Sequence, residues 1–415
     1  MRFFRDLLLA GLATAAVILA LEGGLRLARA HYEASLYEPE SERGYALRPN
    51  AEGWSVEEAE VYLRINSDGM RDRERPIVRP PHTLRVAVIG SSEADARQVP
   101  LDKTFEAVMN RDLSRELEPG GGHADVLGFG APGYTLSQEY LTLHNHVWKY
   151  EPQVVILLFS AFTVLKNTRE FYPGELKGAP VYVLQSGGQL VPDAITRNTP
   201  PIDARRLLWK NRMSDWMNRS YLLCLLNAAR IQSRGLMLME KLRGRPPKVS
   251  PAPGVDPGWS YNPGQPEIEE CWAIADAFVD AMKKDCGLHG AEFRIVTSDF
   301  AAQVHPSLEK RAAFQRSMGL SSLDLVDQRL ERFGATRGIP VLALAGPLGA
   351  YAASHGVFLH GAPPSRDNGG HWNELGNEQA GHVIARELLA RSPVVRAFIQ
   401  VSAVRAPRSS TPIPR

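Results

Sequence analysis

Short and mostly apolar runs recur along the chain and alternate with segments of helical periodicity. The clearest runs are 84–89, 124–127, 154–159, 293–297 and 340–343. Runs of this kind are typical of strands buried on both faces, as in a parallel sheet. Helices are expected at 105–117, 137–149, 267–284, 307–317, 322–336 and 374–390. The alternation predicts a three-layer α/β/α fold with a five-stranded parallel sheet.

This alternation stops after the third run and resumes about a hundred residues later. The interruption ends in a loop-like stretch, 246–266, that contains seven prolines. We therefore predict one α/β domain in two pieces with an insertion between them. The predicted boundaries are an N-terminal segment 1–30, an approach segment 31–80 with one or two short strands, the first part 81–170, an insertion 171–266 with basic helices, the second part 267–400, and a disordered tail 401–415.

The N-terminal segment indicates export. Leu7 to Leu21 are uncharged, and Arg2 and Arg5 precede them. A basic pair before an apolar run is typical of a signal anchor or a signal peptide. By the positive-inside rule the arginines stay in the cytoplasm, so the main domain is expected to be extracytoplasmic (periplasmic), on a single anchor in the cell membrane. The alternative is a secreted chain, cleaved near Ala30.

Composition excludes several classes of protein. Of the 415 residues 44% are hydrophobic and 23% charged, which fits neither a disordered chain nor a multi-span membrane protein. A formal net charge of +2 argues against a nucleic-acid partner. Three cysteines cannot form a disulfide framework, and free thiols are expected. No spacing of cysteine and histidine suggests a metal, and no cofactor is expected.

The candidate chemistry lies at two distant points of the chain. Ser92 follows the first strand of the predicted sheet, at the edge where open α/β sheets bind ligands. His371 stands just before the last predicted helix and is the candidate base. A serine becomes a nucleophile when a base removes its proton, so this pair suggests acyl transfer.

Several segments in order resemble the SGNH (GDSL-type) hydrolase superfamily, in particular its membrane-anchored bacterial members. They are the lead-in Asn66–Arg71, the strand and serine block Leu84–Ser92, the second block Val126–Tyr134, the lead into the third strand Tyr150–Ile156, and the histidine block Gly370–Gly376. The resemblance covers the anchor, most of 43–170 and roughly 285–395.

The resemblance implies an SGNH/flavodoxin-like fold and a serine esterase or O-acyltransferase acting on an ester or an acetylated carbohydrate. It implies Ser92 as nucleophile, His371 as base and Asp367 as the acid that orients the histidine. The backbone N–H groups of Ser92 and Gly130 would hold the oxyanion.

Three departures from the family's pattern keep a second hypothesis open. The usual aspartate of the serine block is Ser91, and two acids, Glu93 and Asp95, follow the serine. The family's acid stands two or three residues before the histidine, whereas Asp367 stands four residues before it. The position of the oxyanion asparagine is Phe162, which has no donor; Thr163 or Asn167 are the nearby substitutes. The alternative is a catalytically inactive SGNH-like protein that binds a glycan or another partner.

The insertion has a charge bias of its own. Residues 203–248 contain eleven lysines and arginines but three acids, with Leu, Met and Trp between them. One interpretation is a solvated helix hairpin packed on the main domain. The other is a basic amphipathic surface that rests on anionic lipid beside the anchor. The oligomeric state is left open, and His355 and His360 are interpreted as surface groups.

Overall fold

A five-stranded parallel sheet forms the centre of the molecule in a computed structural model, which describes residues 2–165, 179–185, 187–193, 196, 202–242, 266–361 and 369–405. Its order is β11-β10-β7-β5-β6. The strands are β5 (Thr83–Gly90), β6 (His123–Gly130), β7 (Val154–Phe159), β10 (Glu292–Thr297) and β11 (Val341–Ala343). All five were expected from the apolar runs. The order is that of flavodoxin-like doubly wound sheets, with the chain reversing direction across the sheet after β6.

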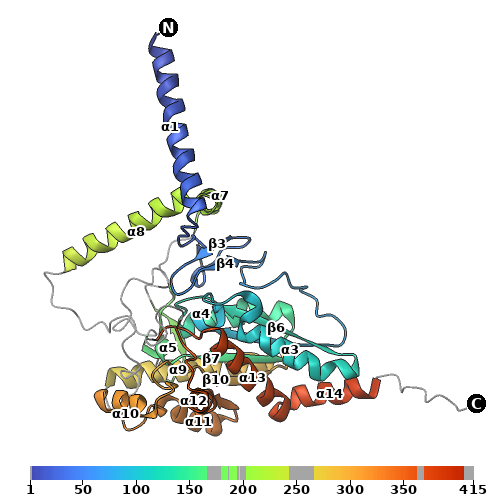
Figure 1. Cartoon of the computed structure of the whole chain (residues 1–415). Coiled ribbons are helices and arrows are strands. Elements are labelled where there is room, and N and C mark those ends of the chain that lie inside the picture. Colours follow the sequence, from blue (N-terminus) through green and yellow to red (C-terminus); the bar gives the residue numbers. More distant parts are fainter. Residues whose placement is uncertain are drawn as a thin grey trace, which may run out of the picture.

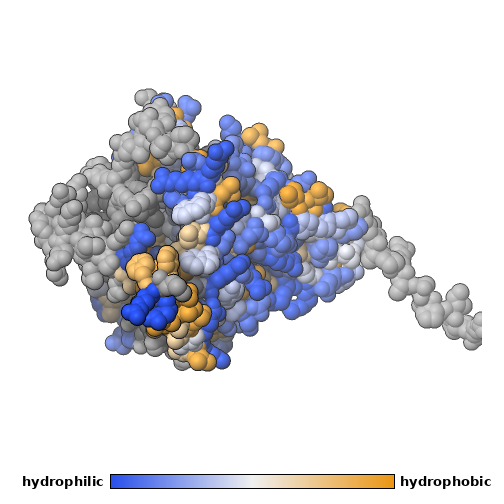
Figure 2. Space-filling model, turned by 90° about the horizontal axis from the view of Figure 1, so that it is seen from above, coloured by the Kyte–Doolittle hydropathy of each residue, from blue (hydrophilic) through white to orange (hydrophobic). Residues whose placement is uncertain are grey.

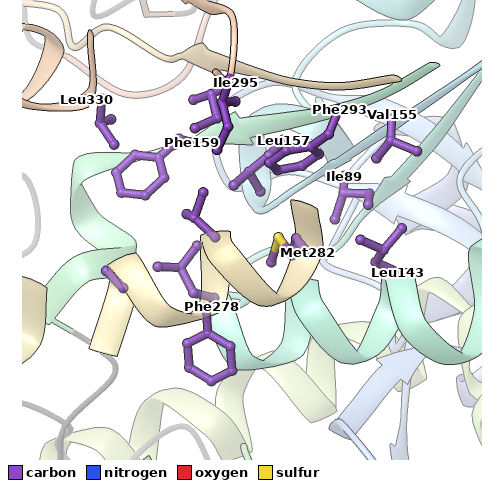
Figure 3. Close-up of a cluster of buried hydrophobic side chains, with 14 of the residues drawn as sticks. Ile89, Leu143, Val155, Leu157, Phe159, Phe278, Met282, Phe293, Ile295 and Leu330 are labelled. Atoms are coloured by element: carbon purple, nitrogen blue, oxygen red, sulfur yellow. The ribbon is translucent and has the colours of Figure 1, made fainter. Parts of the chain in front are cut away.

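Helices cover both faces of this sheet (Figure 1). One face carries α3 (Phe105–Leu117), α12 (Ala345–His355) and α13 (Glu374–Arg391). The other face carries α4 (Leu136–Thr142), α9 (Pro266–Leu288) and α11 (Leu325–Arg337). Successive side chains of a strand point to opposite faces of the sheet, so each face has its own core. Figure 3 shows the core on the face covered by α4, α9 and α11, where α9 lies over the sheet. The predicted three-layer α/β/α architecture is confirmed.

Three smaller helices complete the domain: α5 (Ala161–Leu165) follows β7, α10 (Leu308–Ser317) precedes α11, and α14 (Pro393–Arg405) follows α13. The single helix expected at 137–149 is instead α4 followed by a π-helical turn, Leu143–Val147. This wider turn lets His144 and Trp148 both reach Asp285 of α9, at 3.2 and 3.0 Å. The tail predicted from residue 401 begins within α14, and residues 406–415 lie outside the described residues.

The approach segment is more ordered than the sequence suggested. It forms two antiparallel hairpins, β1 (Tyr37–Glu40) with β2 (Gly44–Leu47), and β3 (Glu52–Ser55) with β4 (Val61–Arg64). Their buried side chains make a third, smaller core together with Ala131 and Tyr134, which follow β6. The hairpins therefore pack next to the carboxyl edge of the sheet.

The insertion contains a small hairpin, β8 (Tyr182–Leu184) with β9 (Leu190–Pro192), and two helices, α7 (Ala204–Asn218) and α8 (Tyr221–Leu242). Helix α7 packs on the N-terminal hairpins: Asn211 donates to Glu38 at 2.5 Å, and Arg48 forms an ion pair with Asp215. This differs from the interpretation in which the basic helices pack on the main domain. The N-terminal helix α1 (Arg2–Leu27) projects from this end of the molecule (Figure 1).

The three cysteines, Cys224, Cys271 and Cys286, are free and buried, as expected.

Candidate active site

Ser92 lies immediately beyond the carboxyl end of β5 and begins a one-turn helix, α2 (Ser92–Asp95). The turn passes very close to β7, because a Cβ on Gly90 would lie 3.2 Å from the Cβ of Leu158. Glycine at position 90 is what allows this approach. The structure thus places Ser92, half-buried, at the sheet edge expected from the sequence.

The side chain of His371 contacts that of Ser92, although the two residues are distant in the sequence. Its Nε2 lies 2.7 Å from Ser92 Oγ, although 279 residues separate them in the chain. The histidine stands two residues before Asn373, the N-cap of α13, which accepts a hydrogen bond from the Gly376 N–H at 2.9 Å. This cap fixes where the helix starts and hence the position of the segment that carries His371.

A carboxylate holds the other side of the imidazole, and it belongs to Glu58. Glu58 Oε1 lies 2.5 Å from His371 Nδ1, and Oε2 accepts the backbone N–H of His371 at 3.0 Å. Two contacts from one carboxylate fix both the position and the tautomer of the ring. The predicted acid, Asp367, lies outside the described residues. In the described part of the chain, the carboxylate on His371 is Glu58.

The glycine pair before His371 makes room for this carboxylate. Gly369 and Gly370 have φ values of +96° and +90°, a region that favours glycine. A Cβ on Gly370 would lie 3.0 Å from Glu58 Oε2. The sequence analysis did not consider Glu58, because it lies 313 residues before His371 in a segment expected to be irregular. The acid-rich stretch Glu57–Glu60, between β3 and β4, was the available signal.

Charge around His371 favours its protonated form. Burial opposes a charge on the ring, but the carboxylates of Glu93 and Glu58 outweigh burial and raise the pKa of His371 to about 9. Burial likewise opposes the charge on Glu58, and the hydrogen bonds and charge of His371 outweigh it, so the pKa of Glu58 lies below its ordinary value. Both shifts indicate an ion pair between the two side chains at neutral pH.

Of the two acids that follow Ser92, only one acts on the reacting groups. Glu93 Oε2 lies 3.3 Å from Ser92 Oγ. The carboxylate of Asp95 is fully buried and accepts a hydrogen bond from Arg97 at 2.9 Å, so its charge is balanced by the guanidinium. Glu93 is therefore the carboxylate whose charge acts on the serine.

The lead-in segment supports α2 from behind. Asn66 Oδ1 accepts the N–H groups of Asp68 and Met70 at 3.0 and 2.9 Å and closes a turn. This turn delivers the buried Arg71, which donates to the carbonyl oxygen of Asp95 at 2.6 Å. A buried guanidinium on the last residue of α2 fixes the helix that begins with Ser92.

A buried pair supports the histidine block. His360 Nε2 lies 2.9 Å from Asp299 Oδ2, and His360 Nδ1 lies 2.9 Å from the carbonyl oxygen of Gly370. Trp372 Nε1 donates to the other oxygen of Asp299 at 2.8 Å. The expectation that His360 is a surface group is wrong: it is 4% exposed. Burial opposes its charge, but Asp299 outweighs burial and raises the pKa of His360.

The predicted oxyanion donor Gly130 lies at the same edge as the serine. It ends β6 and pairs in register with Gly90 of β5. Phe162 is 44% exposed at the start of α5. The hydroxyl of Thr163 is buried and donates to the carbonyl oxygen of Ser160 at 2.7 Å. The second substitute, Asn167, lies outside the described residues.

Comparison with known proteins gives similarity at the level of structure. No family model matches the sequence, and no curated protein is similar to it at a significant level. Similar solved structures include an acetyl xylan esterase with 11% identity, covering 74% of this chain and 98% of the other at a TM-score of 0.33. A lipase/acylhydrolase from Enterococcus faecalis has 12% identity, with coverages of 74% and 96% and a TM-score of 0.34. TesA has 10% identity, with coverages of 75% and 99% and a TM-score of 0.35. Identities and TM-scores this low say nothing about activity.

The order of the sheet strands and the positions of Ser92 and His371 around it agree with the blocks found in the sequence. This arrangement is the one that the resemblance to the SGNH hydrolases implies. Three SGNH blocks lie where the resemblance implies: the serine follows the first sheet strand, Gly130 ends the second, and the histidine precedes a late helix. In the described residues, the carboxylate partner of the histidine comes from the N-terminal hairpins.

Proposed function

We propose that the chain is a serine ester hydrolase or O-acyltransferase that acts on an ester or an acetylated carbohydrate. The observation that carries this proposal is the hydrogen-bonded series Ser92–His371–Glu58, with distances of 2.7 and 2.5 Å. A nucleophile, a base and an acid in contact are the machinery of acyl transfer.

The first half of the reaction forms an acyl-enzyme. Neutral His371 takes the proton of the Ser92 hydroxyl at Nε2 while Ser92 Oγ bonds to the ester carbonyl carbon. The backbone N–H groups of Ser92 and Gly130 are the proposed donors to the resulting oxyanion. When the tetrahedral species collapses, His371 returns the proton to the departing alcohol, and the acyl group stays on Ser92. Glu58 holds the imidazolium through this exchange.

The second half repeats the chemistry with a new nucleophile. His371 takes a proton from water or from a sugar hydroxyl, whose oxygen bonds to the acyl carbon. The bond from that carbon to Ser92 Oγ then breaks, and His371 returns the proton to Ser92 Oγ. Water makes the chain an esterase, and a sugar hydroxyl makes it an acyltransferase. The same residues serve both outcomes.

We place this chemistry outside the cytoplasm. One helix in the described part of the chain, Arg2–Leu27, is long and apolar enough to cross a membrane, and none of its residues is buried in the protein. The basic residues at its start favour a cytoplasmic N-terminus and an extracytoplasmic domain. Retention as an anchor is the proposal, with cleavage near Ala30 as the alternative.

A second function has two observations in its favour. Phe162 offers no donor where the family has an oxyanion asparagine, and one such donor is worth about 10²–10³ in rate. Glu93 places negative charge 3.3 Å from Ser92 Oγ. Both fit an inactive protein that binds a glycan or a partner at the same edge of the sheet.

Hydrolysis of p-nitrophenyl acetate by the purified chain separates the two functions. Ser92→Ala is expected to lower kcat/KM at least about 10³-fold, because the nucleophile is removed. Ser91→Ala removes a neighbouring hydroxyl that makes no contact with His371 and serves as the matched control, with activity within about threefold of wild type. Unchanged hydrolysis by Ser92→Ala would rule out the esterase proposal.

A further inference from the structure

The foot of α1 is fixed to the corner between α7 and α8. The carboxylate of Glu22 accepts the N–H groups of Tyr221 and Leu222 at 3.1 and 2.9 Å and the Ser220 hydroxyl at 2.9 Å. It therefore satisfies N–H groups at the first turn of α8, as a capping side chain does. Arg26 donates to the carbonyl oxygen of Arg219 at 2.6 Å. The C-terminal end of α1 and the first turn of α8 are therefore in direct contact.

Helix α7 and the first turns of α8 expose large apolar side chains beside this junction. Leu208, Trp209 and Trp216 of α7 are 62%, 64% and 61% exposed. Leu226 and Ile231 of α8 are 56% and 64% exposed. We call residues 204–231 the collar. Tryptophan and leucine exposed together on one short hairpin are costly in water and typical of a helix at a membrane interface.

The collar is also cationic. It contains six basic residues against one acid, Asp215, which Arg48 already pairs. The six are Arg205, Arg206, Lys210, Arg212, Arg219 and Arg230. Figure 2 looks onto this end of the molecule from above, with α1 directed toward the viewer, and hydrophobic residues lie there beside strongly hydrophilic ones. A bilayer that contains anionic lipid has a negatively charged surface and an apolar interior. A protein surface that mixes cationic and apolar side chains is complementary to both.

The length of the anchor supplies the third argument. The uncharged stretch Leu7–Leu21 has 15 residues. At about 1.5 Å per residue it spans about 22 Å, less than the hydrocarbon thickness of about 30 Å. The helix Arg2–Leu27 as a whole is long enough to cross, so the turns that flank its uncharged stretch, Glu22 to Leu27 among them, lie at the level of the headgroups. The residues that adjoin these turns are the collar, and Figure 1 shows α8 leaving the foot of α1 at a steep angle to it.

We propose that the collar lies in the headgroup region of a bilayer containing anionic phospholipid and holds the catalytic domain at a fixed height and tilt above it. The proposal rests on the membrane location given under the proposed function but not on the esterase activity. It joins two segments that are about 200 residues apart in sequence, because the Ser220 hydroxyl donates to Glu22 at 2.9 Å.

Fluorescence quenching in nanodiscs tests this proposal with the full-length chain. The discs contain phosphatidylcholine and phosphatidylglycerol, with a spin label at a shallow position of the acyl chain. Wild-type tryptophan emission is expected to be quenched, and the double variant Trp209→Phe/Trp216→Phe is expected to lose at least half of that quenching. Trp148→Phe, on the α/β domain, is the matched control and is expected to leave the quenching unchanged. Discs of phosphatidylcholine alone are expected to give at least twofold less quenching.

Other outcomes would overturn the proposal. Flotation of the chain with the discs shows independently whether α1 inserts in the bilayer. Hydrolysis of p-nitrophenyl acetate shows independently whether the candidate site is active. A chain that floats while Trp209 and Trp216 stay unquenched has an anchored helix but no interfacial collar. Shielding of these two tryptophans that follows protein concentration, not lipid, would assign the collar to contact with a second copy.

Discussion

At the scale of single residues, the proposed mechanism depends on Glu58. Replacing it by glutamine keeps the shape of the side chain but removes the charge that stabilises the imidazolium. We expect Glu58→Gln to lower kcat about 10³–10⁴-fold with little change in KM, because the loss falls on the transition state. Steady-state kinetics with an ester substrate measure this.

The matched control is the adjacent acid. Glu57 is exposed, so Glu57→Gln makes the same change of charge without touching the His371 ring. It is expected to stay within about threefold of wild type. Equal losses in both variants would mean that general electrostatics, not the contact at Nδ1, is responsible.

The charge on His371 predicts an alkaline rate profile. The base must be neutral to accept the Ser92 proton, and its pKa is about 9. The neutral fraction therefore rises about tenfold per pH unit up to pH 9, and kcat/KM should rise with it and level off above. Glu93→Gln removes a negative charge that favours the imidazolium, so the rising limb should move to lower pH by about one unit. A profile that is flat between pH 6 and 9 would contradict this.

At the scale of elements, the site depends on how closely α2 approaches β6. A Cβ on Gly130 would lie 2.5 Å from the backbone N of Asp95 and 2.5 Å from the carbonyl carbon of Ala94. Neither contact can be relieved by rotating a side chain. Gly130→Ala should therefore displace α2 and Ser92 with it, and lower kcat/KM by at least about 10²-fold.

Circular dichroism distinguishes displacement from unfolding in that variant. The far-ultraviolet spectrum should stay native, because the sheet and the large helices are untouched. Gly128→Ala, two residues earlier in β6, is the control, since its Cβ would meet the side chain of Glu106 at 3.3 Å. Wild-type activity in Gly130→Ala would show that α2 has more freedom than the packing indicates.

The elements themselves were largely predictable from the sequence, and the reason is periodicity. Strands buried on both faces leave short and mostly apolar runs, and the Thr104 side chain caps α3 by accepting from the Ala107 N–H at 3.3 Å. The four short strands of the N-terminal hairpins were mostly missed. Their burial comes from contact with Ala131 and Tyr134, which are distant in the chain. The helices of the insertion were seen, but not the surface on which they pack.

The site was predictable where a residue borders an element of the sheet. Ser92 follows β5 and His371 precedes α13, so topology alone brings the two residues to one edge of the sheet. Glu58 is on a loop between two short strands, and only the docking of that hairpin brings it to His371. The pairing of Asp95 with Arg97 was also invisible, because it depends on the left-handed turn at Ala96, whose φ is +46°.

At the scale of the whole molecule, the N-terminal hairpins link the end that carries α1 to the candidate site. They carry Glu58 to His371 and provide the surface on which α7 packs. The anchor, the collar, the hairpins and the sheet edge therefore form one continuous series of contacts. The candidate site thus takes the partner of its histidine from the hairpins that lie between α7 and the sheet.

The central claim is that Ser92 is a nucleophile activated by His371 and Glu58. Labelling of the full-length chain by a fluorophosphonate, read by mass spectrometry of the Ser92 peptide, tests it most directly. We predict label on Ser92 that increases between pH 7 and 9, is absent from Ser92→Ala and is strongly reduced in Glu58→Gln. Folded wild-type protein that takes no label at Ser92 across this pH range would contradict the claim.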